Sequence, residues 1–156
     1  MAAEKLRNQT EQKDMWDLSP LFTDDTAWES LFDSIKNRIS EYDAFRGTLG
    51  QSAARLRAAL DVDMELSRAL DRLYTYAHLK NDEDKTNSVY TALLDRATML
   101  YTRIAEASSF MTPEIHAIPD ATMNGFLADT VLEPYRYYLT RLLRYKPHTR
   151  SLEVEE

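Results

Sequence analysis

The chain has 156 residues, with 3 glycines, 5 prolines, no cysteine and a net charge of −7 at pH 7. This length suits one domain, and the scarcity of turn residues favours an all-α fold. The lack of cysteine excludes disulfides, Cys-based zinc sites and thiol nucleophiles, which agrees with a reducing compartment. The negative charge repels nucleic acid and acidic membranes, so we expect neither partner unless a local basic patch compensates.

The first residues of the sequence lack the continuous apolar core of a signal peptide. Residues 1–13 are polar and charged, and no run of about 18 apolar residues occurs in the sequence. We therefore predict a cytoplasmic protein in which residues 1–14 form a flexible leader. Residues 15–22 include Trp16 and Phe22, and Pro20 disfavours helix before it, which predicts an extended arm packed on the body of the protein.

The first helix is predicted to begin near Asp24 to Thr26. Thr26 and Glu29 have the spacing of a capping box, and Asp24 adds negative charge at the positive end of the helix dipole. Gly47 predicts the end of this helix, and Ser52 can cap the next one. The expected buried face comprises Trp28, Leu31, Phe32, Ile35, Ile39 and Tyr42.

The centre of the chain predicts an antiparallel helical hairpin. The stripe Leu66, Leu70, Leu73 and Ala77 steps by four, three and four residues, which places it on one face of a helix. The acidic run at residues 81–84 predicts a turn that is short enough to make the next helix antiparallel. That helix, from Asn87 to about Phe110, is expected to cover the stripe with Tyr90, Leu93, Leu94, Ala97, Leu100, Tyr101 and Ile104.

The first helix of the hairpin has an irregular apolar pattern. The pattern drifts between Leu60 and Met64, so this helix is either a short helix followed by a long one or a single bent helix.

Tyrosines at helical spacing are more typical of a core than of a binding platform. We therefore expect Tyr74, Tyr76, Tyr90 and Tyr101 to be core residues.

The second half of the chain predicts shorter helices. Three starts are indicated by prolines, at Thr112 with Pro113, at Pro119, and at Pro134. A helix is expected from Pro134 to Pro147. Residues 151–156 combine a hydroxyl cap with glutamates, as at the beginning of a helix, which predicts that this polypeptide is the front part of something longer.

No catalytic, cofactor-binding or metal-binding residue can be assigned from the sequence. The three histidines, His78, His116 and His148, lie far apart and outside any H-E-x-x-H or H-x-H pattern. His78 could face Asp82 one turn later in a weak metal or acid/base cluster, but we interpret it as an ordinary histidine at a helix C-terminus, where its charge suits the helix dipole. Glycine-rich phosphate loops and the Gly-x-Ser-x-Gly motif are also absent from the sequence.

A basic and aromatic patch lies near the end of the chain, without an acid between Pro134 and Arg150. Such a mixture can bind nucleic acid or an acidic peptide. The simpler interpretation is that the tyrosines pack while the arginines lie at a surface or interdomain seam. The patch comprises Arg136, Arg141, Arg144, Lys146 and Arg150, with Tyr135, Tyr137, Tyr138 and Tyr145.

Several segments, in the same order and over about residues 15–156, resemble the N-terminal region of oligoendopeptidase F, a zinc metallopeptidase family that cleaves short peptides. The segments are Trp16-Asp17-Leu18-Ser19, Ala27-Trp28-Glu29, Phe45-Arg46-Gly47-Thr48-Leu49, Leu73-Tyr74-Thr75-Tyr76-Ala77-His78-Leu79, Tyr90-Thr91-Ala92-Leu93-Leu94-Asp95-Arg96-Ala97 and Pro134-Tyr135-Arg136-Tyr137-Tyr138-Leu139. The resemblance implies an α-helical lobe beside a catalytic lobe, walling a channel that admits short peptides. It also implies that Zn2+ is held by an H-E-x-x-H helix and a glutamate beyond residue 156.

Two functions from different classes remain open. The chain is either the non-catalytic front lobe of such a peptidase, with the catalytic lobe in cis or on a separate chain and an oligopeptide as the substrate of the complete enzyme, or a free-standing helical module that binds another protein. The first is favoured, with a hairpin lobe at residues 15–111 and a truncated subdomain at residues 112–156. It predicts no activity of the chain alone and an uncovered apolar surface after Thr112.

Overall fold

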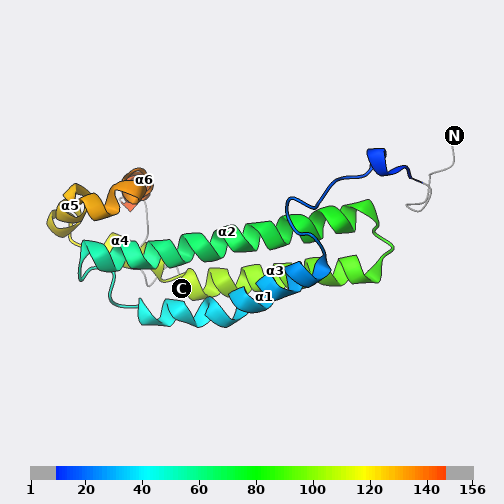
Figure 1. The fold of residues 1–156 in the computed structure, drawn as a ribbon. Coiled ribbons are helices and arrows are strands. Elements are labelled where there is room, and N and C mark those ends of the chain that lie inside the picture. Colours follow the sequence, from blue (N-terminus) through cyan, green and yellow to red (C-terminus); the bar gives the residue numbers. More distant parts are fainter. Residues whose placement is uncertain (1–9, 147–156) are drawn as a thin grey trace. The chain divides into compact units, whose positions relative to one another are not determined.

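The computed structural model describes residues 10–146, and this part of the chain is all-α as predicted (Figure 1). No β-strand occurs between residues 10 and 146. Its 3-10 helices are η2 (Gln12–Asp14), η3 (Ile39–Ala44) and η4 (Thr130–Tyr135). Its α-helices are α1 (Asp25–Arg38), α2 (Ala53–Glu83), α3 (Ser88–Ser108), α4 (Met111–Ala117), α5 (Asp120–Ala128) and α6 (Arg136–Arg144).

Packing divides the described chain into two compact units. The first unit combines the residues up to Arg38 with Ser67–Arg103, and the second combines Ile39–Leu66 with the residues from Ile104 on. Helices α2 and α3 therefore each supply a portion to both units. The division into a leader, a lobe over 15–111 and a subdomain from 112 stays a prediction. Residues 1–9 of the leader and the helix predicted at 151–156 lie outside the described residues.

A helical hairpin and α1 form the first unit. The later part of α2 and the earlier part of α3 run antiparallel, which confirms the predicted hairpin (Figure 1). On α2, Leu70, Leu73 and Ala77 are each at most 3% exposed, as their spacing predicts. Trp28 of α1 is fully buried, and its indole Nε1 donates a hydrogen bond to the carbonyl of Leu73 at 3.0 Å. A buried indole N–H needs such an acceptor, so this bond fixes the position of α1 along α2.

The turn of the hairpin lies later than the acidic run predicts. Helix α2 continues through Glu83, so only Asp84 of the predicted turn lies outside the helix. His78 and Asp82 lie four residues apart in the last turns of α2, with 3.5 Å between Nε2 and Oδ2. Side-chain contacts at i and i+4 stabilise a helix, so this contact favours continuation of α2 into the acidic run. The Asn87 side chain accepts a backbone hydrogen bond from the first turn of α3, so the connection ends there.

Helix α1 begins where predicted, but its cap is a different residue. The Asp24 carboxylate accepts a hydrogen bond from the N–H of Ala27 at 2.9 Å, which places Thr26 inside the helix. The capping box predicted for Thr26 and Glu29 is therefore wrong. Glu29 instead pairs with the Arg96 guanidinium of α3 through two contacts of 2.5 and 2.6 Å. Such a bidentate pair is stronger than a bond to a neutral backbone N–H.

The segment before α1 is anchored by one side chain. Phe22 is 5% exposed and packs edge-on against Tyr76, with 5.1 Å between the ring centroids. The Arg72 guanidinium lies 4.5 Å from the Phe22 centroid and donates to the carbonyl of Leu21 at 2.8 Å. Trp16, in contrast, is 54% exposed. The segment packs on the helices as predicted, but a hydrogen-bonded turn just before Phe22 replaces the predicted extended arm.

In the second unit, a left-handed glycine marks the connection from η3 to α2. Gly47 has φ of +74°, a conformation that glycine adopts without a steric penalty. The two carboxylate oxygens of Glu114 accept the backbone N–H groups of Gly47 and Leu49 at 2.8 and 2.6 Å. Ser52 accepts the N–H of Arg55 at 3.1 Å, which confirms its predicted capping role. The helix that follows, α2, is one continuous helix of 31 residues.

The predicted helix starts in the second half of the chain have different outcomes. Helix α4 begins at Met111, so Pro113 is already inside the helix, whereas α5 begins directly after Pro119 as predicted. Pro134 lies inside η4, and α6 begins two residues after it. Met111 is 6% exposed and Leu132 is fully buried. Helix α4 and η4 therefore begin before their predicted proline starts, and the additional turns bring Met111 and Leu132 into the core.

The predicted core is only partly correct for the tyrosines. Tyr76 is buried, but Tyr74 and Tyr101 are 38% and 57% exposed, because packing on one side of each helix leaves these positions outside. Half-buried positions among the expected core residues are Leu31, Ile39, Tyr90 and Leu94. In the described part of the chain, no helix combines the length and apolar character needed to cross a membrane. The cytoplasmic location stays a prediction.

We expect Phe22→Ala to lower the free energy of unfolding by about 3 kcal/mol, because it removes a buried ring and leaves a cavity against Tyr76. Trp16→Ala is the matched control. It removes a larger but exposed side chain and should change stability by less than about 0.5 kcal/mol. Urea unfolding followed by circular dichroism measures both variants, and equal losses would contradict the anchoring role of Phe22.

Two glycines allow a test of the backbone at the η3–α2 connection. A Cβ added at Gly47 or Gly125 meets no atom within 4 Å, so the two positions differ in backbone conformation and not in space. Gly47→Ala should destabilise the fold by about 1 kcal/mol, since an L-residue is strained at positive φ. Gly125→Ala, inside α5, should stabilise it by about 0.5–1 kcal/mol. Calorimetric unfolding should shift the two midpoints in opposite directions.

Candidate functional site

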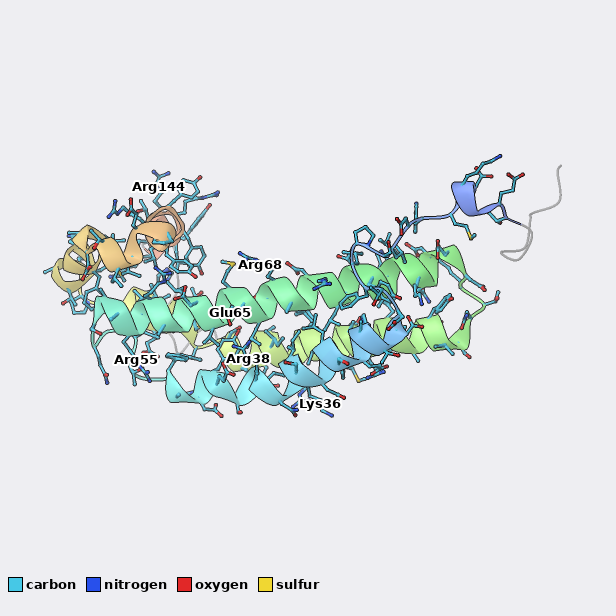
Figure 2. All side chains as sticks on the ribbon, in the orientation of Figure 1. Lys36, Arg38, Arg55, Glu65, Arg68 and Arg144 are labelled. Atoms are coloured by element: carbon cyan, nitrogen blue, oxygen red, sulfur yellow. The ribbon has the colours of Figure 1, made fainter. Side chains whose placement is uncertain are left out.

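Helix α6 has one buried and one exposed face. Leu139 is fully buried, whereas Tyr137 is 74% exposed. Arg141 and Arg144 are also exposed and follow Tyr137 at i+4 and i+7, so the three share the outer face of the helix. We call these three residues the α6 stripe. The Arg141 guanidinium carbon lies 5.9 Å from the Tyr137 ring centroid, and Figure 2 shows Arg144 among the side chains that project from α6 away from α2.

An ion pair on α2 holds the segment that leads into α6. Nε of Arg57 donates to the Asp61 carboxylate at 2.7 Å, and Nη1 donates to the carbonyl of Val131 at 2.8 Å. The hydroxyl of Tyr135 donates to the same carboxylate at 2.7 Å. Burial opposes ionisation of Asp61, but the hydrogen bonds from Tyr135 and Arg57 and the Arg57 charge outweigh it and lower the pKa of Asp61. The Asp61 carboxylate therefore holds the end of η4 through Tyr135, and Arg57 holds its start through Val131.

A second carboxylate of α2 lies close to α6. Asp63 accepts a hydrogen bond from the hydroxyl of Tyr42 at 2.8 Å. Burial, this bond and the Asp63 charge raise the pKa of Tyr42, and burial with the Asp63 charge raises the pKa of Tyr138. Both phenols therefore remain protonated at neutral pH, and neither is a candidate base.

The basic residues near α6 differ in what they contact. Lys146 pairs with Asp120 at 2.6 Å, and Arg136 donates to a main-chain carbonyl of α5 at 3.0 Å. Arg141 and Arg144 form no ion pair with a carboxylate within residues 10–146. The predicted patch therefore separates into cations that hold the fold together and two exposed guanidinium groups on the α6 stripe.

The histidines do not assemble a site in the described part of the chain. His78 faces Asp82 as predicted, but its side chain is 49% exposed. Nε2 of His116 lies 3.2 Å from a main-chain carbonyl oxygen of α6. Within residues 10–146 no group of three or more His, Asp or Glu side chains could hold a metal ion. His148 and Arg150 lie outside the described residues.

The carboxylates that organise both units were largely missed by the sequence analysis. Asp25 accepts a hydrogen bond from the hydroxyl of Tyr76 at 2.8 Å and pairs with Lys80 of the same unit. Glu114 bridges to a loop more than sixty residues earlier. Only the Arg57 to Asp61 spacing, four residues along one helix, is a signal that a sequence can carry.

The sequence of this chain is similar to a family model and to several peptidases. A family model described as Oligopeptidase F matches residues 114–156. The oligopeptidase PepF of Bacillus subtilis is 35% identical over 163 aligned positions, which cover 100% of this chain and 24% of that protein. The Group B oligopeptidase PepB of Streptococcus agalactiae is 32% identical, over 96% of this chain and 25% of that protein.

Solved structures give the same result. The crystal structure of a putative peptidase from Chlamydophila abortus superimposes with a TM-score of 0.86 and 30% identity, over 96% of this chain and 25% of that one. Oligoendopeptidase-F from Enterococcus faecium gives 0.76 and 30%, over 84% of this chain and 25% of that one. The chain thus spans about a quarter of the length of the relatives that it matches.

Asp61 should make stability depend on pH in the acid range. Because its pKa is lower in the folded than in the unfolded chain, it stabilises the fold above its ordinary pKa, and this contribution is lost as the pH falls through the folded value. Asp61→Asn should cost about 1 kcal/mol at neutral pH and flatten the acid limb of the stability profile. Asp71→Asn, at an exposed position of α2, is the control. Urea midpoints between pH 2 and pH 7 measure both, and parallel profiles of Asp61→Asn and the unsubstituted chain would refute the role of Asp61.

Proposed function

Because this chain corresponds to an N-terminal part of the oligoendopeptidase F-like peptidases, we propose that it is a non-catalytic helical lobe of such an enzyme. In this proposal its helices wall the channel through which short peptides reach the active site of the complete enzyme. The observation that carries the proposal is that 96–100% of this chain aligns with only about a quarter of each relative. The catalytic lobe, in cis or as a separate chain, is then its partner.

The polar contacts of the chain support a scaffold. Asp61, Glu29 and Glu114 each bind groups of their own unit, and these bonds set the positions of helices and loops. A carboxylate used in this way is not available as a general acid or base for a substrate. This supports a role in shape and not in peptide bond cleavage.

Zinc chemistry belongs, in this proposal, to residues outside the chain. The sequence contains three histidines and no H-E-x-x-H. His78 and Asp82 lie 3.5 Å apart, but the described residues offer them no third ligand. Structural and catalytic zinc sites require three or four protein ligands. The described residues of this chain therefore do not fit a zinc site, and no hydrolytic step is assigned to them.

A chimera tests the proposal. The stretch of Bacillus subtilis PepF that aligns with this chain would be replaced by the chain, and hydrolysis of an internally quenched fluorescent oligopeptide would be measured. We expect the chimera to hydrolyse the peptide, whereas the isolated chain and PepF without this stretch should give no hydrolysis. A folded but inactive chimera, beside active PepF, would favour the free-standing interaction module instead. Hydrolysis by the isolated chain would contradict the non-catalytic role.

A further inference from the structure

We propose that the α6 stripe docks against a carboxylate-bearing surface in the remaining part of the peptidase. This inference rests on the proposed function and adds the side chains that make the contact. The stripe consists of Tyr137, Arg141 and Arg144, one exposed face of a helix whose opposite face is anchored by Leu139. Helical recognition commonly uses side chains at i, i+4 and i+7, which is the spacing of the stripe.

The charge of the stripe indicates the chemistry of its partner. Residues 134–146 include four basic residues and no acid. Lys146 and Arg136 are held within the second unit, which leaves Arg141 and Arg144 without a carboxylate among residues 10–146. A guanidinium group presents donors in a planar fork that matches a carboxylate. The complementary surface should therefore carry aspartate or glutamate side chains.

The exposure of the stripe indicates a large partner. Tyr137 is 74% exposed, and Tyr145, at i+8 from it, is 58% exposed. Tyrosine and arginine are enriched among the residues that dominate the energy of protein interfaces. Small ligands, in contrast, bind in concave sites, and an exposed helix face does not enclose them. The sequence predicts an uncovered apolar surface after Thr112, whereas the exposed face of α6 combines tyrosines with arginines, which suits docking of a protein surface.

The stripe is also held in place before any partner binds. The Asp61 carboxylate and Arg57 fix η4, the segment immediately before α6. Leu139 fixes the rotation of the helix, because turning it would expose a fully buried side chain. An interface that is already ordered loses less conformational entropy on binding.

The remaining part of the peptidase is the occupant best supported by these observations. About three quarters of each relative lies outside the stretch that this chain matches, and the matching family model covers α6 itself. Nucleic acid, with its phosphate backbone, is disfavoured as a partner because the whole chain carries a net charge of −7, which repels it on approach. Binding of nucleic acid or of a second copy of this chain would be an alternative result of the experiment.

The experiment reverses the charge of the stripe in the PepF chimera described above. Arg141→Glu with Arg144→Glu places carboxylates opposite the partner's acids and should reduce peptide hydrolysis by about tenfold or more. Thermal unfolding of the same protein should separate into two transitions, because the lobes no longer stabilise each other. Arg141→Lys with Arg144→Lys keeps the charge and should retain more activity than the reversal. Arg68→Glu with Arg103→Glu is the matched control, since both residues are exposed and the net charge changes equally.

The outcomes separate the two proposals. If the unsubstituted chimera is inactive although folded, the proposed function fails and the docking inference fails with it. If that chimera is active and the stripe variant behaves like the Arg68 and Arg103 control, only the docking inference fails. Two measurements on the isolated chain complete the test. Stripe-dependent binding of a fluorescent DNA oligonucleotide, or a stripe-dependent dimer in sedimentation, would overturn the inference in favour of nucleic acid or a second copy.

Discussion

The contact between Trp28 and Leu73 couples α1 to the hairpin of the first unit. The indole is fully buried and donates to the Leu73 carbonyl, so it combines apolar burial with a hydrogen bond that permits one position of α1 along α2. Glu29, one residue further, pairs with Arg96 of α3, whose guanidinium lies 5.1 Å from the Trp28 ring centroid. Three helices therefore meet at two adjacent side chains, and Phe22 packs the preceding segment onto the same unit.

The second unit uses carboxylates in a comparable way. Asp61 binds Arg57 and Tyr135, and Glu114 binds two backbone N–H groups of the loop before α2. These acids are engaged inside the unit, whereas the arginines on the outer face of α6 have no carboxylate partner among residues 10–146. A chain with an acidic overall balance thereby presents a local basic surface. Packing decides which charged side chains are paired and which are exposed, so the charge of one surface can differ from the net charge of the whole sequence.

The distribution of polar groups connects the fold to the proposed role. An enzyme active site needs titratable groups that converge in one place and remain free to contact a substrate. In the described residues the phenols of Tyr42 and Tyr138 are held protonated, and the Asp63 carboxylate is engaged by the hydroxyl of Tyr42. A scaffold has the opposite requirement, since every polar group should be satisfied internally. Among residues 10–146, Asp61, Glu29 and Glu114 are each hydrogen-bonded within their own unit, as expected of a helical scaffold.

The sequence alone determined the helical class, the hairpin and the face of α2 that is buried, because the spacing of Leu70, Leu73 and Ala77 is a local property of a helix. It also carried the resemblance to oligoendopeptidase F. The tertiary structure decided where helices begin and end. Asp24 caps α1, and Glu29 pairs with Arg96 of α3. It also decided which arginines of α6 remain exposed, because partners far apart in the chain become neighbours only when the helices pack.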